Sequence, residues 1–254
     1  WFAVEATTLV SAPLINYRGD RLSIEAAWKY LIICSVSIAF AMLGILFIAY
    51  AELVSGGQVS LDLQQLLAPD VHLDQSWLRA GFVFFTVGMA TKMGLAPLHT
   101  WKPDAYGEAP GAVGALLAGS LTSVAFLAVM RGQQIMNAAG DGQTGRHTLL
   151  VFGVISLAMA AISIVRQPDF KRTLAYSSVE HMGILAIGVG VGGLALFGVM
   201  LHLLVNSFTK GALFLTAANI HRAFGSRRYP DVQGALRVLP VTAVLFLLGF
   251  LAIS

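Results

Sequence analysis

The stretch FVFFTVGMATKMGLAP, residues 82–97, places a lysine within a long apolar run and a proline five residues after it. Such a run predicts a helix that crosses a membrane, and Lys92 lies well inside it. Proline removes a backbone donor, and Gly94 loosens the chain just before it. The sequence therefore predicts a transmembrane helix that is broken between Lys92 and Pro97, an arrangement that recurs where membrane proteins bind ions.

The whole chain has the composition of an integral membrane protein. Its 254 residues are 57% apolar and 11% charged, whereas an average soluble domain is about 25% charged. So few charges cannot cover a soluble globule, and the apolar content excludes disorder. The net charge of +3 does not indicate a nucleic-acid-binding surface, and the single Cys34 excludes a disulfide scaffold. The chain begins and ends in apolar sequence without an initiator methionine, so we expect an internal fragment of a longer protein.

Eight apolar runs are long enough, or nearly so, to cross a bilayer, since about 20 helical residues span the hydrocarbon core. They are too long for barrel strands and lack a two-residue alternation, so they are read as helices. We therefore expect an all-α, polytopic transmembrane bundle that forms one domain over residues 1–254. The runs lie at residues 1–15, 30–51, 80–101, 111–130, 148–165, 173–192, 194–218 and 239–254.

Basic residues are distributed unevenly among the segments between these runs. Alternate segments hold eleven Lys and Arg residues, and the opposite segments hold three. Cytoplasmic loops of membrane proteins carry the excess of Lys and Arg, so the richer set is expected on the cytoplasmic side. The four predicted cytoplasmic loops are 16–29, 102–110, 166–172 and 219–238.

Four residues of the Lys, Arg, Asp and Glu types lie within the apolar runs: Lys92, Lys210, Glu5 and Glu180. A charge at the bilayer centre costs at least about 2.5–3.5 kcal/mol on insertion scales. These side chains must therefore face the protein interior, a water-filled cavity or one another. The alternative is that a lysine reaches the nearer interface with its long side chain, but Lys92 lies too deep in its run for this to be easy.

A polar stripe runs along one of the predicted helices. His202, Asn206 and Lys210 are spaced four residues apart and share one helix face. Such a stripe can simply join helices by hydrogen bonds, but a lysine and a histidine in it favour a proton or ion path. Glu180 and His181 adjoin on the preceding run and are candidate members of the same path. Lysines and glutamates enclosed in a dry bundle can relay protons because proton affinity depends strongly on neighbouring charges.

Several other kinds of site are absent from the sequence. Residues 188–193 match the letters of a dinucleotide-binding glycine motif, but they lie in an apolar run without a strand before them. Neither a Walker motif, a nucleophile elbow, a haem-ligand pair nor a metal-ligand spacing is present. We therefore expect no catalytic residue, no cofactor and no metal in this chain, and whether it counts as an enzyme depends on the complex that contains it.

Three motifs, in this order, make the chain resemble the antiporter-like subunits. These are the proton-channel subunits of respiratory complex I, Mrp antiporters and membrane-bound hydrogenases. The motifs are KMGLAPLHTWKPDA (92–105) followed by Glu108-Ala109-Pro110, DFKRTLAYSS (169–178) followed by Val179-Glu180-His181-Met182-Gly183, and His202 followed by NSFTKGALF (206–214). Glu5, Trp28-Lys29-Tyr30 and the Glu180-His181 pair most resemble the hydrogenase-4 component F branch.

The resemblance implies a fold of about fourteen helices built from two inverted five-helix repeats. On that plan the eight runs resemble helices five to twelve. Glu5 then takes the place of the channel glutamate of helix five, and Lys92 that of the lysine in the broken helix seven. Lys210 takes the place of the lysine of helix eleven, with His202 on the same helix.

One position departs from the family pattern. Many relatives carry a lysine in helix eight, where this sequence has Ser123. A serine cannot hold a titratable proton. Either water held by Thr122 and Ser123 bridges this position, or conduction through the chain is impaired.

These observations predict a proton-translocating membrane subunit of a multi-subunit redox complex of the hydrogenase-4 or NADH–quinone oxidoreductase type. The expected proton path is Glu5, Lys92, Glu180, His181, His202, Asn206 and Lys210, with Glu5 and Lys92 as a switchable pair. Expected partners are the other membrane subunits, a peripheral redox arm and the lipid bilayer of a prokaryotic inner membrane, with protons or Na⁺ as the only small substrate and no nucleic acid. The alternatives are a Na⁺(K⁺)/H⁺ antiporter subunit of the Mrp type and a non-conducting structural subunit.

Overall fold

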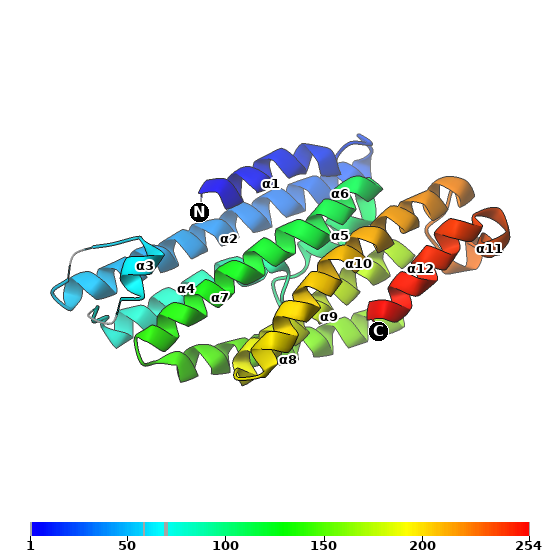
Figure 1. Ribbon diagram of the computed structural model, residues 1–254. Helices are drawn as coiled ribbons and strands as arrows, with labels where there is room; N and C mark the ends of the chain where they lie inside the picture. The colour runs from blue at the N-terminus through cyan, green and yellow to red at the C-terminus, as the bar shows by residue number, and fades with distance from the viewer. Residues whose placement is uncertain (1, 58, 69–70, 254) are drawn as a thin grey trace.

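The computed structural model describes residues 2–57, 59–68 and 71–253 as a bundle of helices (Figure 1). Outside the helices, a single isolated β-bridge joins Asp169 and Arg228 in this part of the chain. The predicted all-α fold is confirmed. The elements in chain order are α1 (Phe2–Ile15), α2 (Arg21–Val54), α3 (Leu63–Leu66), α4 (Gln75–Met93), α5 (Trp101–Glu108), α6 (Gly111–Leu116), a π-helical turn (Leu117–Leu121), α7 (Thr122–Ala138), α8 (Gly142–Val165), α9 (Phe170–Val191), α10 (Ala195–Phe224), a 3₁₀ turn (Tyr229–Asp231), α11 (Ala235–Val238) and α12 (Pro240–Ile253).

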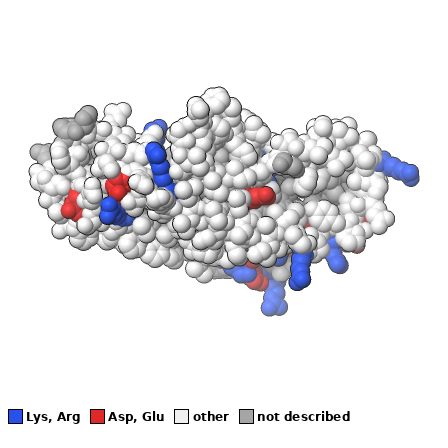
Figure 2. All heavy atoms as spheres, turned by 90° about the horizontal axis from the view of Figure 1, so that it is seen from below, with Lys and Arg blue, Asp and Glu red and all other residues white. Residues whose placement is uncertain are grey.

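The helices have the length and the surface of membrane spans. In the described residues, five helices are long and apolar enough to cross a bilayer: α2, the continuous helix Gly111–Ala138, α8, α9 and α10. Shorter apolar helices lie at α1 and α12, and α4 has 19 residues, so a helix occupies each of the eight predicted runs. Large apolar side chains such as Phe208 are exposed on the outside, and Figure 2 shows a face with large uncharged areas and few charged side chains. This surface suits contact with lipid rather than water.

The helix break falls at Gly94, three residues before Pro97. Gly94 caps α4 in the left-handed conformation with φ +80°. The Gly94 amide donates to the Thr91 carbonyl, and the Leu95 amide donates to the Ala90 carbonyl at 2.8 Å. This pair of bonds is a Schellman motif, which requires the positive φ that glycine adopts most easily. The predicted break between Lys92 and Pro97 is confirmed, and glycine rather than proline ends the helix.

The segment 102–110, expected to be a cytoplasmic loop, is mostly helical, because residues Trp101–Glu108 form helix α5. Pro103 is compatible with this helix since it lies in the first turn, where the amides have no partner within the helix. Ala109 is extended, with ψ 146°, as expected for the residue before Pro110, and the helix ends there. Every residue of α5 except Asp104 is buried, and the helix packs against α2 and α9.

The helix at 111–138 contains a π-helical turn where it meets α10. Gly119 lies in this turn, and a Cβ added there would stand 2.9 Å from the Ser207 carbonyl oxygen. Ser123, one turn later, bonds the Ser207 hydroxyl. The small residues at 111, 119 and 123 therefore let the two helices approach closely, as such residues do in membrane bundles.

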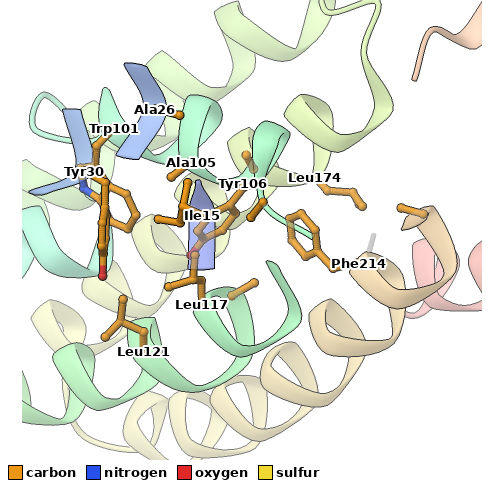
Figure 3. Packing of buried hydrophobic residues seen from close by; sticks show 14 of the residues in the cluster. Ile15, Ala26, Tyr30, Trp101, Ala105, Tyr106, Leu117, Leu121, Leu174 and Phe214 are labelled. Carbon is orange, nitrogen blue, oxygen red and sulfur yellow. The ribbon is translucent and has the colours of Figure 1, made fainter. Parts of the chain in front are cut away.

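An aromatic core surrounds α5. Tyr106 lies edge-on between Trp101 and Phe214, with ring centroids 6.0 and 5.3 Å away (Figure 3). The Tyr30 ring from α2 also packs against Trp101, with the ring centroids 5.1 Å apart. All four side chains are fully buried. This core fixes α5 between α2 and α10, and with it the residues that α5 carries into the bundle.

Candidate functional site

Lys92 is fully buried where α1, α2 and α4 meet. Its Nζ donates to the hydroxyl of Thr8 on α1 and lies 5.4 Å from the centre of the Tyr30 ring on α2. Tyr30 in turn bonds the Ser11 hydroxyl at 2.7 Å. The amine therefore points into the protein, where the Thr8 hydroxyl of a neighbouring helix accepts its hydrogen bond.

Glu5 lies on the same helix as Thr8, about one turn away, and is half-buried. Its Oε1 accepts a bond of 2.8 Å from the Ser35 hydroxyl on α2, while its Oε2 is buried without a partner. Among the described residues, the ion pairs do not include one between Glu5 and Lys92. Both groups occupy one region of the bundle, and in this conformation each is held by a hydroxyl instead of by the other.

Lys210 is fully buried between α9 and α10. Its Nζ donates to the Ser177 hydroxyl at 2.7 Å. Like Lys92, it has no acidic partner within ion-pair distance in the part of the chain that the structure describes. The predicted stripe of α10 therefore faces α9.

The two ends of the stripe both contact α9. His202 Nε2 lies 3.1 Å from His181 Nδ1, and the two rings are tilted by 37°. Between the ends, Asn206 is buried, and neither its Oδ1 nor its Nδ2 has a partner in the described protein. An unpartnered buried amide is costly, so this position suits a bound water or a transient proton carrier.

A cavity of about 330 Å³ opens beside the histidine pair. Glu180, His181 and His202 line it together with Ser177, the partner of Lys210. Neighbours on a helix diverge by about 100°, and the cavity is wide enough to receive both Glu180 and His181. The remaining lining residues are Ile164, Thr173, Ile184, Phe250 and Ile253.

The proposed bridging residues of the helix at 111–138 lie against the same helix α10. Ser123 shares a hydrogen bond of 2.7 Å with Ser207, and Thr122 is buried and donates to the Ala118 carbonyl. Ser207 adjoins Asn206, so the hydroxyl of Ser123 is linked to the backbone segment that carries the polar stripe. No titratable group occupies this position.

Lys102 is a buried residue that sequence reasoning missed, because its position between two apolar runs assigns it to a loop. It is 0% exposed, and its Nζ donates to the Met93 carbonyl at 2.8 Å and approaches the Ser178 carbonyl at 3.5 Å. Lys171, assigned to a loop in the same way, is 1% exposed and donates to the Ala109 carbonyl at 2.8 Å. Both lysines satisfy carbonyls freed where helices end. The neighbouring Trp101, Pro103 and Tyr106 are the available signal that this segment packs inside the protein.

Ion pairs hold the outer side of α5. Asp104 accepts from Arg172 and from Lys29, each at 2.9 Å. Arg227 bonds Glu108 at 3.0 Å and Asp169 at 3.3 Å. These pairs tie the start of α2, the start of α9 and the segment after α10 to one end of the bundle. In the described residues, no group of three or more His, Cys, Asp or Glu side chains is placed to hold a metal ion.

Comparison with known proteins shows that residues 1–254 match the protein family described as "NADH:quinone oxidoreductase/Mrp antiporter, TM". A hydrogenase-4 component F homolog of Methylacidiphilum infernorum is 34% identical over 100% of this chain and 54% of its own length. NADH-quinone oxidoreductase subunit N of Desulforudis audaxviator is 34% identical over 98% of this chain and 49% of its own length. The chain thus spans about half the length of the curated relatives it matches.

Two solved membrane complexes contain a chain of similar fold. One is the archaeal membrane-bound sulfane sulfur reductase, with a TM-score of 0.86 at 22% identity over 97% of this chain and 50% of that one. The other is the Mrp complex from Dietzia sp. DQ12-45-1b, with a TM-score of 0.85 at 22% identity over 98% of this chain and 46% of that one. At this level of identity the likeness concerns the fold, and it confirms the predicted antiporter-like architecture.

Proposed function

Because this chain belongs to the NADH:quinone oxidoreductase/Mrp antiporter transmembrane family, we propose that it conducts protons within a multi-subunit redox complex. The observation that carries this proposal is the burial of Lys92 and Lys210, both 0% exposed and both held by hydroxyl groups rather than by carboxylates. Burying an unpaired ammonium group is expensive. A purely structural helix contact does not require that cost, whereas a site that repeatedly gains and loses a proton does.

The path has two parts. Glu5 and Lys92 form the part between α1, α2 and α4, and the hydroxyls of Thr8 and Ser35 hold their charged groups. Lys210, Asn206, His202, His181 and Glu180 form the part between α9 and α10, which ends at the cavity beside Glu180. Movement of the Lys92 amine from Thr8 toward Glu5 would create the switchable pair expected for such a path. Water held by Thr122 and Ser123 would bridge the path at the helix 111–138, where Ser123 has no titratable group.

The electron transfer would take place in partner subunits. Relatives of this chain are named as subunits of NADH-quinone oxidoreductase and as a hydrogenase-4 component. We infer that the partners here are other membrane subunits, a peripheral redox arm and the lipid bilayer, in a prokaryotic inner membrane. The basic residues Lys29 and Arg172, which pair with Asp104, and Arg227, which pairs with Glu108, support a cytoplasmic position for this end of the bundle, because basic residues collect on that side.

A second candidate is a Na⁺(K⁺)/H⁺ antiporter subunit, which the family description and the similar fold in an Mrp complex both favour. The fold and the buried lysines serve either function. Measurements in the presence and absence of a sodium gradient separate them. Transport that requires sodium and reverses with its gradient would favour the antiporter.

The test uses the intact complex with the full-length subunit, reconstituted into vesicles and assayed with a pH-sensitive dye during redox turnover. We expect Lys92→Ala and Lys210→Ala to abolish the proton transport that depends on this chain. Arg131→Gln is the control, since among the described residues Arg131 bonds only Gln134 of its own helix, at 2.8 Å, and lies at the surface. Undiminished proton transport in both lysine variants would refute the proposal and leave a structural subunit.

A further inference from the structure

A third buried lysine lies between the two parts of the proposed path. Lys102 is 0% exposed at the start of α5, and none of the ion pairs in the described residues includes it. Its Nζ contacts the backbone at two places that are far apart in sequence, the Met93 carbonyl at 2.8 Å and the Ser178 carbonyl at 3.5 Å.

These two contacts place Lys102 beside both halves. Met93 directly follows Lys92, the lysine of the first half. Ser178 directly follows Ser177, whose hydroxyl holds the Nζ of Lys210 in the second half. One amine from α5 and one amine from α10 therefore meet α9 at adjacent residues. The break in α4 creates this position, since it frees the Met93 carbonyl and is followed by α5, which packs against α2 and α9.

Polar atoms without protein partners flank Lys102 on its own segment. His99 Nδ1 and the Tyr106 hydroxyl are buried, and neither has a hydrogen-bond partner in the described protein. The His99 carbonyl accepts from the Lys102 amide at 2.9 Å, and the Tyr106 ring centre lies 5.7 Å from the Lys102 Nζ. Buried polar atoms of this kind commonly bind ordered water, which can carry protons between neighbouring groups.

We propose that Lys102 is an additional proton-relay residue that connects the Lys92 half of the path to the Lys210 half. The inference rests on the proposed function. In each cycle the neutral Lys102 amine takes a proton released by the Lys92 ammonium, through an intervening hydroxyl or water. The resulting Lys102 ammonium then releases a proton toward the neutral Lys210 amine. Each transfer breaks one N–H bond and forms another, and no oxidant or reductant is consumed.

The alternative is a purely structural role, in which Lys102 only donates a hydrogen bond to the carbonyl at the end of α4. Lys171 provides a matched comparison because it is equally buried and also donates to a carbonyl at a helix end, that of Ala109 at 2.8 Å. Two substitutions at Lys102 separate the roles. Glutamine can still donate a hydrogen bond to the Met93 carbonyl, but it cannot accept and release a proton. Arginine keeps the charge and the donors, but it does not release its proton in proteins.

The experiment compares Lys92→Ala, Lys102→Gln, Lys102→Arg and Lys171→Gln in the intact complex in vesicles. Proton transport per electron is measured for assembled complex only, with thermal stability as a second measurement. The reference is the share of transport that Lys92→Ala removes. We expect each Lys102 variant to reduce this share of proton transport at least about tenfold, as for other positioned proton-transfer groups. Lys171→Gln should retain the full share.

The contrary outcomes are distinct. If Lys92→Ala removes transport while both Lys102 variants keep it, Lys102 is not a relay residue and the proposed function stands. If Lys102→Arg alone keeps full transport, or if Lys171→Gln loses as much as Lys102→Gln, the role of Lys102 is structural. If Lys92→Ala removes nothing, the relay from Lys92 to Lys102 fails, and the proposed function fails with it when Lys210→Ala also removes nothing. If Lys102→Gln does not assemble, Lys102→Arg alone decides.

Discussion

The imidazoles of His181 and His202 meet nitrogen to nitrogen, with 3.1 Å between Nδ1 of the first and Nε2 of the second. A bond between two ring nitrogens needs one donor and one acceptor, so the two facing nitrogens share a single proton. The pair comes from two different helices and lines the cavity that also receives Glu180. It is therefore placed to pass one proton at a time between the polar stripe of α10 and this cavity.

The histidine pair predicts a loss of transport when either ring is removed. His202→Phe keeps a ring of similar size but has no nitrogen to share a proton. We expect proton transport through this chain to fall at least about tenfold, in line with the loss of a positioned proton-transfer group. His147→Phe is the control because His147 lies exposed on α8. Equal transport in the two variants, measured in vesicles with a pH-sensitive dye, would exclude the pair from the path.

The bond between Ser123 and Ser207 predicts coupled effects on transport. If the two hydroxyls hold a common water, Ser123→Ala and Ser207→Ala should each lower proton transport by a similar factor. The double variant should then be no worse than either single one, because residues that share one interaction are not additive. Independent, multiplying losses would contradict a shared role. Ser55→Ala is a suitable control, since in the part of the chain that the structure describes its hydroxyl bonds only the Ala51 carbonyl of its own helix.

The helix break predicts an unusual sensitivity at Gly94. Its φ is +80°, and a Cβ added there would stand 2.6 Å from Cδ of Lys102. Gly225 is a matched control, since it caps α10 with φ +68° and a Cβ added to it would have nothing within 4 Å. We expect Gly225→Ala to cost about 1 kcal/mol of unfolding free energy, from backbone conformation alone.

At Gly94 the conformational cost and the clash add together. We expect Gly94→Ala to lower the thermal midpoint of the purified complex more than Gly225→Ala does. Because the clash would displace the Lys102 side chain, Gly94→Ala should also lower proton transport. Equal midpoints for the two variants would show that the approach of Lys102 to Gly94 is not tight.

The ion pair at the other end of the bundle predicts a defined pH dependence. Asp141, in the turn between α7 and α8, accepts from Nε of Arg79 at 2.6 Å. The hydrogen bond from Arg79 lowers the pKa of Asp141 below the ordinary value of 3.8, and Thr144 adds to the effect. A lowered folded-state pKa means that the stabilisation is complete above the unfolded value and disappears as the pH falls through the folded value.

Parent protein and Asp141→Asn should therefore differ at pH 7 and converge below the pKa of Asp141 in the folded protein. Because Arg79 is half exposed and water screens the pair, we expect this difference to be small. Thermal unfolding in detergent between pH 7 and pH 3 measures it. A gap that widens toward acid pH would contradict the sign of this pKa shift.

Much of the fold can be predicted from local sequence. Hydropathy locates a helix in each of the eight runs, and the four-residue spacing of His202, Asn206 and Lys210 places them on one face, which the structure directs at α9. The Gly94–Pro97 segment predicts the break, although the glycine conformation rather than the proline ends the helix. The segment after the break is expected to be a loop, because its lysine and carboxylates suggest a polar surface. It is instead the helix α5, and its aromatic residues are the signal for burial.

Local patterns alone establish that this chain is a membrane bundle with lysines inside it, since hydropathy and helix periodicity depend on residues close together in the chain. The group that each buried amine meets depends instead on tertiary packing: Thr8 rather than Glu5 for Lys92, Ser177 for Lys210, and the carbonyls of Met93 and Ser178 for Lys102. Most of these partners come from helices that are remote in sequence. A hydrogen bond acts over only a few ångströms, so the packing of those helices decides it, and local sequence patterns do not contain that information.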